Sequence, residues 1–417
     1  MTSFRFLHAA DIHLDSPLHG LSRYEGLPVE DIRSATRAAF DNLVQYAIDA
    51  AVDFVVIAGD LFDGEWRDMG TGLYFARAMG RLDQASIPAF VLSGNHDAAS
   101  TISRTVPWPP NVRLFGSRKP ETHHLAELSV VVHGQSFATP AVTDNLVLAY
   151  PPPKEAAFNI GVLHTALSGR VGHASYAPCS EEDLRSKGYD YWALGHVHEF
   201  EIVSEEPYMV FPGNIQGRSI RETGLKGAVL VTVVDGEITA VERAELDVIR
   251  WIRLDVDSGG ATRDEIADRV RGELNRVQGA NGSGRPLVVR VSLVGETVDA
   301  GTLHDQTSHL RDEVRAIAAS ISPDLHIEKV NVQVSEPVTR DRPVIGEDLD
   351  ALINEGALNP DLIKTVQTDL ERFLVAANSA LGERDDGALR LLASQGDWSA
   401  ILKTASLALR SRLKGEA

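Results

Sequence analysis

Short apolar runs alternate with amphipathic stretches along roughly the first 240 residues of the chain. Continuous apolar runs such as Phe4–His8, Asp53–Ile57 and Ala89–Leu92 are typical of strands that helices cover on both faces of a sheet. Between the first two, Ile32–Ala51 places apolar residues at helical spacing, which predicts an amphipathic helix. Further strands are expected at Ser129–His133, Ile160–Leu163, Tyr191–Leu194, Met209–Phe211 and Ala228–Val234. The pattern predicts an α/β (α+β) sandwich of sheets flanked by helices.

A different unit follows. Trp251–Val256 alternates apolar and polar residues, as a half-buried strand does. The capping-box sequence from Thr262 to Glu265 opens a helix to about Val277, and the glycines of 279–284 predict a flexible loop. A strand, a helix and a strand are then expected at Leu287–Leu293, Leu310–Ile321 and Ile327–Val334.

The C-terminal region is expected to be helical. Helices are predicted at Glu347–Glu355, Pro360–Leu381 and Trp398–Leu413. The last helix carries one apolar face, which either packs on its own domain or docks on a partner helix. That face consists of Ile401, Leu402, Ala405, Leu409 and Leu413.

The length of 417 residues predicts about three domains. We expect a catalytic domain, a small α+β capping domain, a linker and a helical region that docks on a partner. Their predicted bounds are 1–247, 248–335, 336–346 and 347–417.

Composition indicates an ordinary soluble protein, with 43% hydrophobic and 24% charged residues. The sequence has no apolar stretch that predicts a membrane span, and the first strand begins too early to leave room for a signal peptide. Cys179 is the sole cysteine, so no intrachain disulfide can form, and we expect a cytoplasmic protein. The net charge of −19 is mild evidence against tight DNA binding by this chain alone.

Five short motifs of potential metal ligands lie in order along the first half. A single Asp-x-His motif or a single histidine at a strand end can equally be a solvated or structural residue with no catalytic role. Five such motifs, each at the end of a predicted strand, favour a two-metal site that hydrolyses a phosphate ester with an activated water. The motifs are Asp11-Ile12-His13, Gly59-Asp60-Leu61-Phe62-Asp63, Gly94-Asn95-His96-Asp97, His164 and Gly195-His196-Val197-His198.

The order and spacing of these motifs resemble the calcineurin-like metallophosphoesterase superfamily, and the resemblance implies a four-layer sandwich with two metal ions. It also implies that Asp63 orients His96, whose imidazolium would stabilise phosphate charge or protonate the leaving oxygen. Mixed oxygen and imidazole ligation suits Mn²⁺, Fe or Zn²⁺, and the resemblance favours Mn²⁺. The implied ligands are Asp11, His13, Asp60 and His198 for one ion, and Asp60, Asn95, His164 and His196 for the other.

A narrower resemblance, specific over about residues 4–235, is to the SbcD-type DNA-repair nucleases and, within them, to the YhaO group. It rests on FLHAADIHL at 6–14 with GDLFD at 59–63, and on GHASYAPC at 172–179 and FPGNIQGR at 211–218. It implies a homodimer, DNA as substrate, and docking of the C-terminal helices on an SMC-like coiled-coil ATPase. The chain departs from archaeal and eukaryotic relatives at Asp63, where they carry His, so their substrate contacts there do not transfer.

The sequence gives weaker evidence for the roles of the remaining polar residues. Arg218, Arg221 and Lys226 follow a Pro-Gly-Asn turn and are candidates for contacts to a DNA backbone, although surface cations are usually only solvated. His8 and His133, on strand-like runs, are expected to be satisfied core or rim histidines. The sequence has no Walker-type motif, so ATP hydrolysis would come from a partner.

The leading hypothesis is a metal-dependent DNA exonuclease, with endonuclease activity also possible, acting in double-strand-break repair. One alternative is a phosphoesterase for nucleotides or other small substrates, against which the extra region 248–417 argues. The other is a DNA-end-tethering scaffold with incidental nuclease activity. The sequence leaves open the cleavage polarity, the preferred DNA end, the native metal, the dimer surface and the need for the partner.

Overall fold

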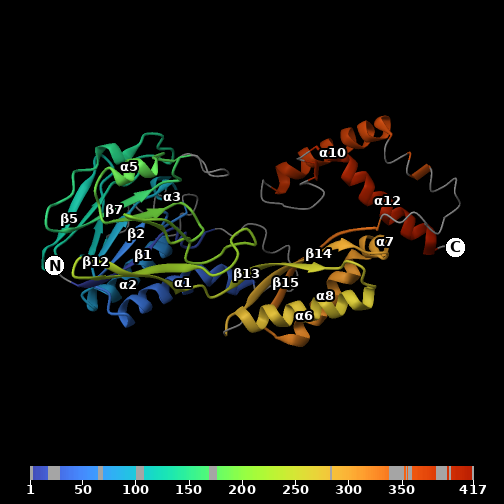
Figure 1. The fold of residues 1–417 in the computed structure, drawn as a ribbon, viewed down its shortest axis with the longest axis horizontal. Helices are drawn as coiled ribbons and strands as arrows, with labels where there is room; N and C mark the ends of the chain where they lie inside the picture. Colours follow the sequence, from blue (N-terminus) through green and yellow to red (C-terminus); the bar gives the residue numbers. More distant parts are fainter. Residues whose placement is uncertain are drawn as a thin grey trace. The chain divides into compact units, whose positions relative to one another are not determined.

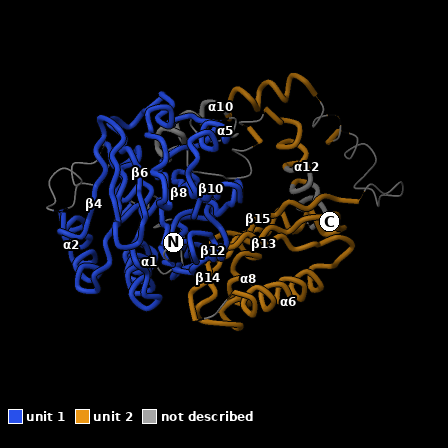
Figure 2. Tube along the Cα trace, turned by 60° about the vertical axis from the view of Figure 1, so that its left-hand side comes forward, with its two compact units in different colours: residues 1–19, 28–251 blue, residues 20–27, 252–417 orange. Residues whose placement is uncertain are grey.

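A computed structural model describes most of the chain (Figure 1). The described residues are 3–16, 29–63, 69–99, 108–168, 176–281, 284–337, 359–381 and 396–415, with short pieces at 352–353, 355 and 392–393. Most of the predicted linker 336–346, most of the predicted helix Glu347–Glu355 and residues 172–175 lie outside them. The chain divides after Trp251 into two compact units (Figure 2).

Two six-stranded sheets form the first unit. The order of the first sheet is β12-β11-β1-β2-β3-β4, with β1 to β4 parallel, and that of the second is β5-β6-β7-β8-β10-β9, with β6, β7, β8 and β10 parallel. The first sheet contains β1 (Phe4–Ala9), β2 (Phe54–Ala58), β3 (Ala89–Leu92), β4 (Val112–Leu114), β11 (Gly227–Val234) and β12 (Glu237–Glu245). The second contains β5 (Glu121–Leu125), β6 (Val130–Gly134), β7 (Phe158–His164), β8 (Tyr191–Gly195), β9 (Glu201–Glu205) and β10 (Tyr208–Phe211).

An aromatic core lies between the two sheets. Phe6 and Phe54 stack with ring centroids 5.1 Å apart, and the edge of Tyr191 from the second sheet meets Phe6 at 5.2 Å. Valines such as Val132 and Val162 complete the contact from the second sheet. Because side chains alternate along a strand, the neighbours of Phe6 and Phe54 face the opposite side of the first sheet.

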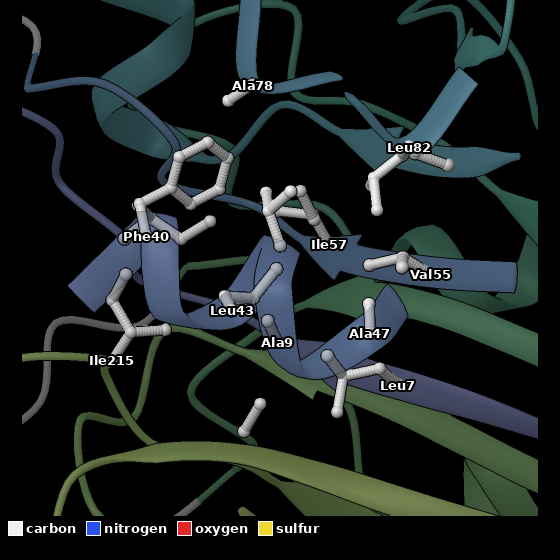
Figure 3. Packing of buried hydrophobic residues seen from close by; sticks show 14 of the residues in the cluster. Leu7, Ala9, Phe40, Leu43, Ala47, Val55, Ile57, Ala78, Leu82 and Ile215 are labelled. Atoms are coloured by element: carbon white, nitrogen blue, oxygen red, sulfur yellow. The ribbon is translucent and has the colours of Figure 1, made fainter. Parts of the chain in front are cut away.

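That opposite side is covered by helices α1 (Val29–Asp49) and α2 (Met69–Gln84). Leu7, Val55 and Ile57 of the strands pack there against residues of both helices, including Phe40 and Leu82 (Figure 3). The outer face of the second sheet is covered by α5 (Glu181–Arg185) and the short helix η3 (Leu146–Ala149), around Trp192 and Leu184. The unit therefore has the predicted four layers, and burial on both faces explains why its central strands are apolar throughout.

The parallel strands bring the five motifs to one rim of the sandwich. β1, β2 and β3 of the first sheet lead directly into the Asp11, Asp60 and Asn95 motifs, while β7 and β8 of the second sheet end at His164 and Gly195. Carboxyl ends of neighbouring parallel strands lie at the same edge, so the sheet order alone gathers the polar side chains.

The second unit contains a three-stranded sheet of order β13-β14-β15, and β14 and β15 are parallel. Helices α6, α7 and α8 pack on it through residues such as Val270, Val291 and Val314. The flexible loop predicted from Gly279 is wrong at its start, because α6 continues to Asn281. The elements are β13 (Arg250–Asp257), α6 (Arg263–Asn281), β14 (Leu287–Glu296), α7 (Ala300–Asp305), α8 (Thr307–Ile321) and β15 (Leu325–Ser335).

Two longer helices follow, α10 (Pro360–Leu381) and α12 (Trp398–Gly415). The Asn359 side chain caps α10 by accepting from the amides of Asp361 and Leu362. On α12, Trp398 and Ile401 are buried, whereas Leu409 is 48% exposed. Among the described residues, only part of the predicted apolar face is therefore covered. None of the helices among the described residues has the length and apolarity to cross a membrane.

The inter-sheet core generates a stability prediction. Phe54 is fully buried, so Phe54→Ala leaves a cavity and should lower the free energy of unfolding by about 3–5 kcal/mol. Urea unfolding followed by circular dichroism measures the loss. The control Leu148→Ala removes a side chain that is 69% exposed and should change the value by less than about 0.5 kcal/mol. Equal effects from the two variants would contradict the proposed core.

Candidate metal centre

The first two motifs run side by side and share backbone hydrogen bonds. The amide of Asp11 donates to the Gly59 carbonyl at 3.0 Å, and the amide of His13 donates to the Asp60 carbonyl at 3.0 Å. Asp11, His13 and Asp60 all have left-handed backbone, with φ of 49°, 46° and 53°, and His196 has φ of 95°. Such conformations are costly for residues other than glycine and cluster at functional sites.

Ligand atoms converge in groups that could each hold a metal ion. In the first, the Nε2 atom of His198 lies 3.6 Å from Asp11 Oδ1 and 3.4 Å from the Nε2 atom of His13. In another, the Nε2 atom of His164 lies 3.4 Å from Asp60 Oδ2 and 2.9 Å from Asn95 Oδ1. Asp60 is shared, since its Oδ2 atom also lies 3.8 Å from His13 Nε2. The groups are Asp11, His13 and His198; His13, Asp60 and His96; and Asp60, His164 and His196.

The chemistry of these donors fits divalent cations. Asp11 and Asp60 are each 1% exposed, and a buried carboxylate needs a compensating positive charge. The ring of His164 donates from Nδ1 to the Ala58 carbonyl at 3.0 Å, so the lone pair of its neutral form is on Nε2 and faces Asp60 and Asn95. In the neutral form, His164 Nε2 and Asn95 Oδ1 are two hydrogen-bond acceptors that face each other, unless a cation lies between them. The atom of His13 that faces the other ligands is Nε2, and its Nδ1 atom is buried with no hydrogen-bond partner among the described residues.

Protons occupy these positions when no metal does. Burial opposes a charge on His164, but the charge and hydrogen bond of Asp60 raise its pKa to about 9. Burial also opposes a charge on His198, whose pKa the carboxylates of Asp11 and Glu222 raise to about 9. A metal ion would therefore displace protons on binding, and metal affinity should weaken in acid.

His96 stands beside the cluster and is oriented by Asp63. The Nδ1 atom of His96 lies 3.1 Å from Asp63 Oδ1, and the hydroxyl of Ser16 donates to the other oxygen of Asp63 at 2.7 Å. The side chain of His96 is 41% exposed, so it can reach a substrate. Burial lowers the pKa of His96, but the hydrogen bond that its ring donates to Asp63 and the charges of Asp60 and Asp63 outweigh burial and raise that pKa.

Asp97 has a structural role that the sequence did not reveal. Its buried carboxylate accepts from the amides of Leu61, Phe62 and Gly94, at 3.1, 2.8 and 3.0 Å. It thereby ties the turn after β2 to the turn after β3. A Cβ atom on Gly94 would clash with Asp60 Oδ1, so the close approach of the two turns also requires glycine at that position.

Glu222 is the second residue that the sequence did not indicate. Its Oε1 atom accepts from the Nδ1 atom of His198 at 2.8 Å and also from the guanidinium of Arg218. Glu222 is 24 residues from His198 along the chain, so only the fold brings the two together.

The three candidate DNA contacts differ in their surroundings. Arg218 lies next to His198 and pairs with Glu222 at 2.7 Å, and Arg221 is exposed. Lys226 is 3% exposed, and its ammonium donates to the His198 carbonyl at 2.7 Å. The structure thus gives Lys226 a contact within the protein.

His8 and His133 have the structural surroundings that were predicted. His8 bonds the hydroxyl of Tyr191 at 3.0 Å and the carbonyl of Leu194 at 3.2 Å. His133 lies between Thr122 and Asn159.

Comparisons with known proteins find two family matches along the chain. Residues 4–200 match the calcineurin-like phosphoesterase family, and residues 251–335 match the middle domain of the metallophosphoesterase YhaO. The chain is 37% identical to the uncharacterized metallophosphoesterase YhaO of Bacillus subtilis strain 168 over 261 residues, which are 62% of this chain and 64% of that protein.

Two archaeal relatives are more distant. The DNA double-strand break repair protein Mre11 of Methanopyrus kandleri is 28% identical over 64% of this chain and 62% of its own length. Mre11 of Sulfurisphaera tokodaii is 23% identical over 75% of this chain and 79% of its own length. The matches to YhaO and to the first Mre11 thus span less than two thirds of those relatives.

The buried histidine beneath the site generates a pH prediction. Burial lowers the pKa of His8 from 6.5 to about 3 in the folded protein. Between these values the unfolded chain binds a proton that the folded protein does not, so stability present above pH 6.5 is lost as the pH falls. One such group contributes a decline of up to about 1.4 kcal/mol per pH unit.

His8→Gln should remove this contribution while its amide can still bond Tyr191 and Leu194. The difference in unfolding free energy between wild type and His8→Gln should therefore shrink on acidification from pH 7 to pH 4.5. Urea unfolding of metal-free protein measures it, with the exposed His124→Gln as control. A constant difference across this range would show that His8 does not remain neutral in the fold.

Proposed function

We propose that this chain, which carries a calcineurin-like phosphoesterase domain and a YhaO middle domain, is a two-metal phosphodiesterase that hydrolyses DNA. The observation that carries the proposal is the shared position of Asp60. Its buried carboxylate lies between His13 and His164, and its other oxygen accepts from the amide of His96 at 2.9 Å. The two ligand groups and the candidate proton donor thus meet at one side chain.

The first ion would be held by Asp11, His13, Asp60 and His198, and the second by Asp60, Asn95, His164 and His196. Mixed carboxylate, amide and imidazole donors suit Mn²⁺, which we propose as the native metal, and also Fe and Zn²⁺. When bound, the two ions would supply an activated water and positive charge for the phosphate.

The protein's own side chains would contribute general acid catalysis, and His96 is the proposed acid. Asp63 accepts a hydrogen bond from the Nδ1–H group of His96 and thereby fixes the orientation of the ring, which leaves Nε2 of the partly exposed imidazolium for the substrate. A proton held there can be donated to a phosphate oxygen or to the leaving oxygen. Ser16 holds Asp63 from the other side, so the acid is positioned by two successive hydrogen bonds.

Several observations support DNA as the substrate. Two relatives are named for DNA double-strand break repair, and the chain adds to its phosphoesterase domain a second unit that includes the helices α10 and α12. With a net charge of −19, contacts to a DNA backbone would depend on local cations such as Arg218, whose guanidinium lies 3.3 Å from His198 Nδ1. Arg221 is a further candidate, whereas Lys226 is buried and its ammonium is held by the His198 carbonyl.

We also propose a cytoplasmic homodimer whose C-terminal helices dock on an SMC-like coiled-coil ATPase. The exposed Leu409 on α12 and Leu362, which is 41% exposed on α10, support a partner for this region. Apolar side chains at helical spacing are what a partner helix would cover.

The test is a nuclease assay on end-labelled DNA with Mn²⁺, with and without the ATPase partner. Asn95→Ala removes a ligand and should abolish cleavage, and His96→Ala should reduce the rate by about 10²–10⁴-fold through loss of the acid. The matched control His124→Ala replaces an exposed histidine on β5 and should leave the rate unchanged.

Three outcomes would redirect the proposal. Hydrolysis of small phosphodiesters with DNA left intact would contradict DNA as the substrate and favour a small-substrate phosphoesterase. Full rate in His96→Ala would remove that residue from catalysis. Rescue of damage survival by His96→Ala protein would favour a DNA-end-tethering role.

A further inference from the structure

Glu222 is the acceptor for a set of donors at the edge of the candidate metal centre. Its Oε1 atom accepts from His198 Nδ1 at 2.8 Å and from the Arg218 guanidinium at 2.7 Å. Its Oε2 atom accepts from the Arg218 amide at 2.8 Å and from the side-chain amide of Asn214 at 3.0 Å. The carboxylate is 13% exposed and is surrounded by donors from three residues.

We propose that Glu222 is a positioning residue that fixes the tautomer and ring orientation of His198 for the first metal ion. The inference rests on the proposed function, in that it assumes a metal ion at Asp11, His13, Asp60 and His198. Among the described residues, Glu222 forms no hydrogen bond or ion pair with Asp11, His13 or Asp60.

The tautomer follows from the donors around the carboxylate. A carboxylate that accepts from a guanidinium, a backbone amide and a side-chain amide has only acceptor capacity left for His198. The Nδ1 atom of His198 must then be the donor, and Arg218, 3.3 Å from the same atom, cannot also donate to it. The lone pair of the neutral ring is therefore on Nε2, which faces Asp11 and His13.

His164, a proposed ligand of the second ion, is oriented by a different kind of partner. His164 is fixed by the main-chain carbonyl of Ala58, which no substitution can remove, whereas His198 is fixed by a side chain. Loss of such an outer partner typically weakens metal binding by about 10–100-fold. The first ion, not the second, should therefore be sensitive to residue 222.

The charge of Arg218 is a competing explanation for any loss of metal affinity in Glu222 variants, and a double variant separates it from orientation of His198. Glu222 also offsets the charge of this guanidinium next to the cluster, so its loss would place an uncompensated cation near the metal. If charge were the whole effect, removing both side chains would restore metal affinity. If orientation of His198 is the effect, the double variant stays as weak as the single one.

The experiment is calorimetric titration of the purified full chain with Mn²⁺, without DNA. Wild type should bind two ions. Glu222→Ala should weaken one of them by about 10–100-fold, and Glu222→Gln, whose carbonyl can still accept from His198, should lie between. Asn95→Ala, which removes a ligand of the second ion only, identifies which binding event belongs to the first. The exposed Glu205→Ala is the matched control.

The outcomes are distinct. If wild type binds no Mn²⁺, the proposed function itself fails. If wild type binds two ions and both Glu222 variants bind them with wild-type affinity, the positioning role is overturned. Recovery of affinity in Glu222→Ala/Arg218→Ala would also overturn it and assign the effect to charge. If Glu222→Ala does not fold, as judged by circular dichroism, the isosteric Glu222→Gln decides.

Discussion

A buried carboxylate without a fixed counter-charge is the constraint on which the rim of this protein depends. Asp60 is 1% exposed and lies within reach of His13 and His164, while Asp11 lies buried beside His198. Two anions at such depth require cations, so the imidazoles around them bind either protons or metal. Asp11, His13 and Asp60 keep their strained left-handed backbone because the sheet order and the hydrogen bonds between the turns hold them in that conformation.

Much of this arrangement could be predicted from the sequence, because buried parallel strands are recognisable as apolar runs and their polar ends share one edge. The sandwich flanked by helices and the meeting of the five motifs follow from Phe4–Ala9, Phe54–Ala58, Ala89–Leu92 and the later strands, whereas the number of layers came from family resemblance. The division of the ligands between two ions came from family resemblance, and it remains a proposal.

What could not be predicted has tertiary causes. Asp97 was visible in its motif, but its three amide donors come from turns that meet only in the fold. Glu222 is 24 residues from His198, with β9 and β10 between them, so no local pattern links the two residues. Helix α2 was missed because glycines at 70, 72 and 80 weaken its helical signal, whereas packing of Phe75 and Leu82 on the first sheet stabilises it.

The candidate ligands are divided between the two sheets: Asp11, Asp60 and Asn95 follow strands of the first, while His164, His196 and His198 follow strands of the second. A bound ion would therefore cross-link the sandwich at its rim, and by thermodynamic linkage its affinity would measure how firmly the sheets are held together. Substitutions deep in the aromatic core, far from any ligand, would then alter metal occupancy. Loss of activity in such a variant need not indicate a residue of the site.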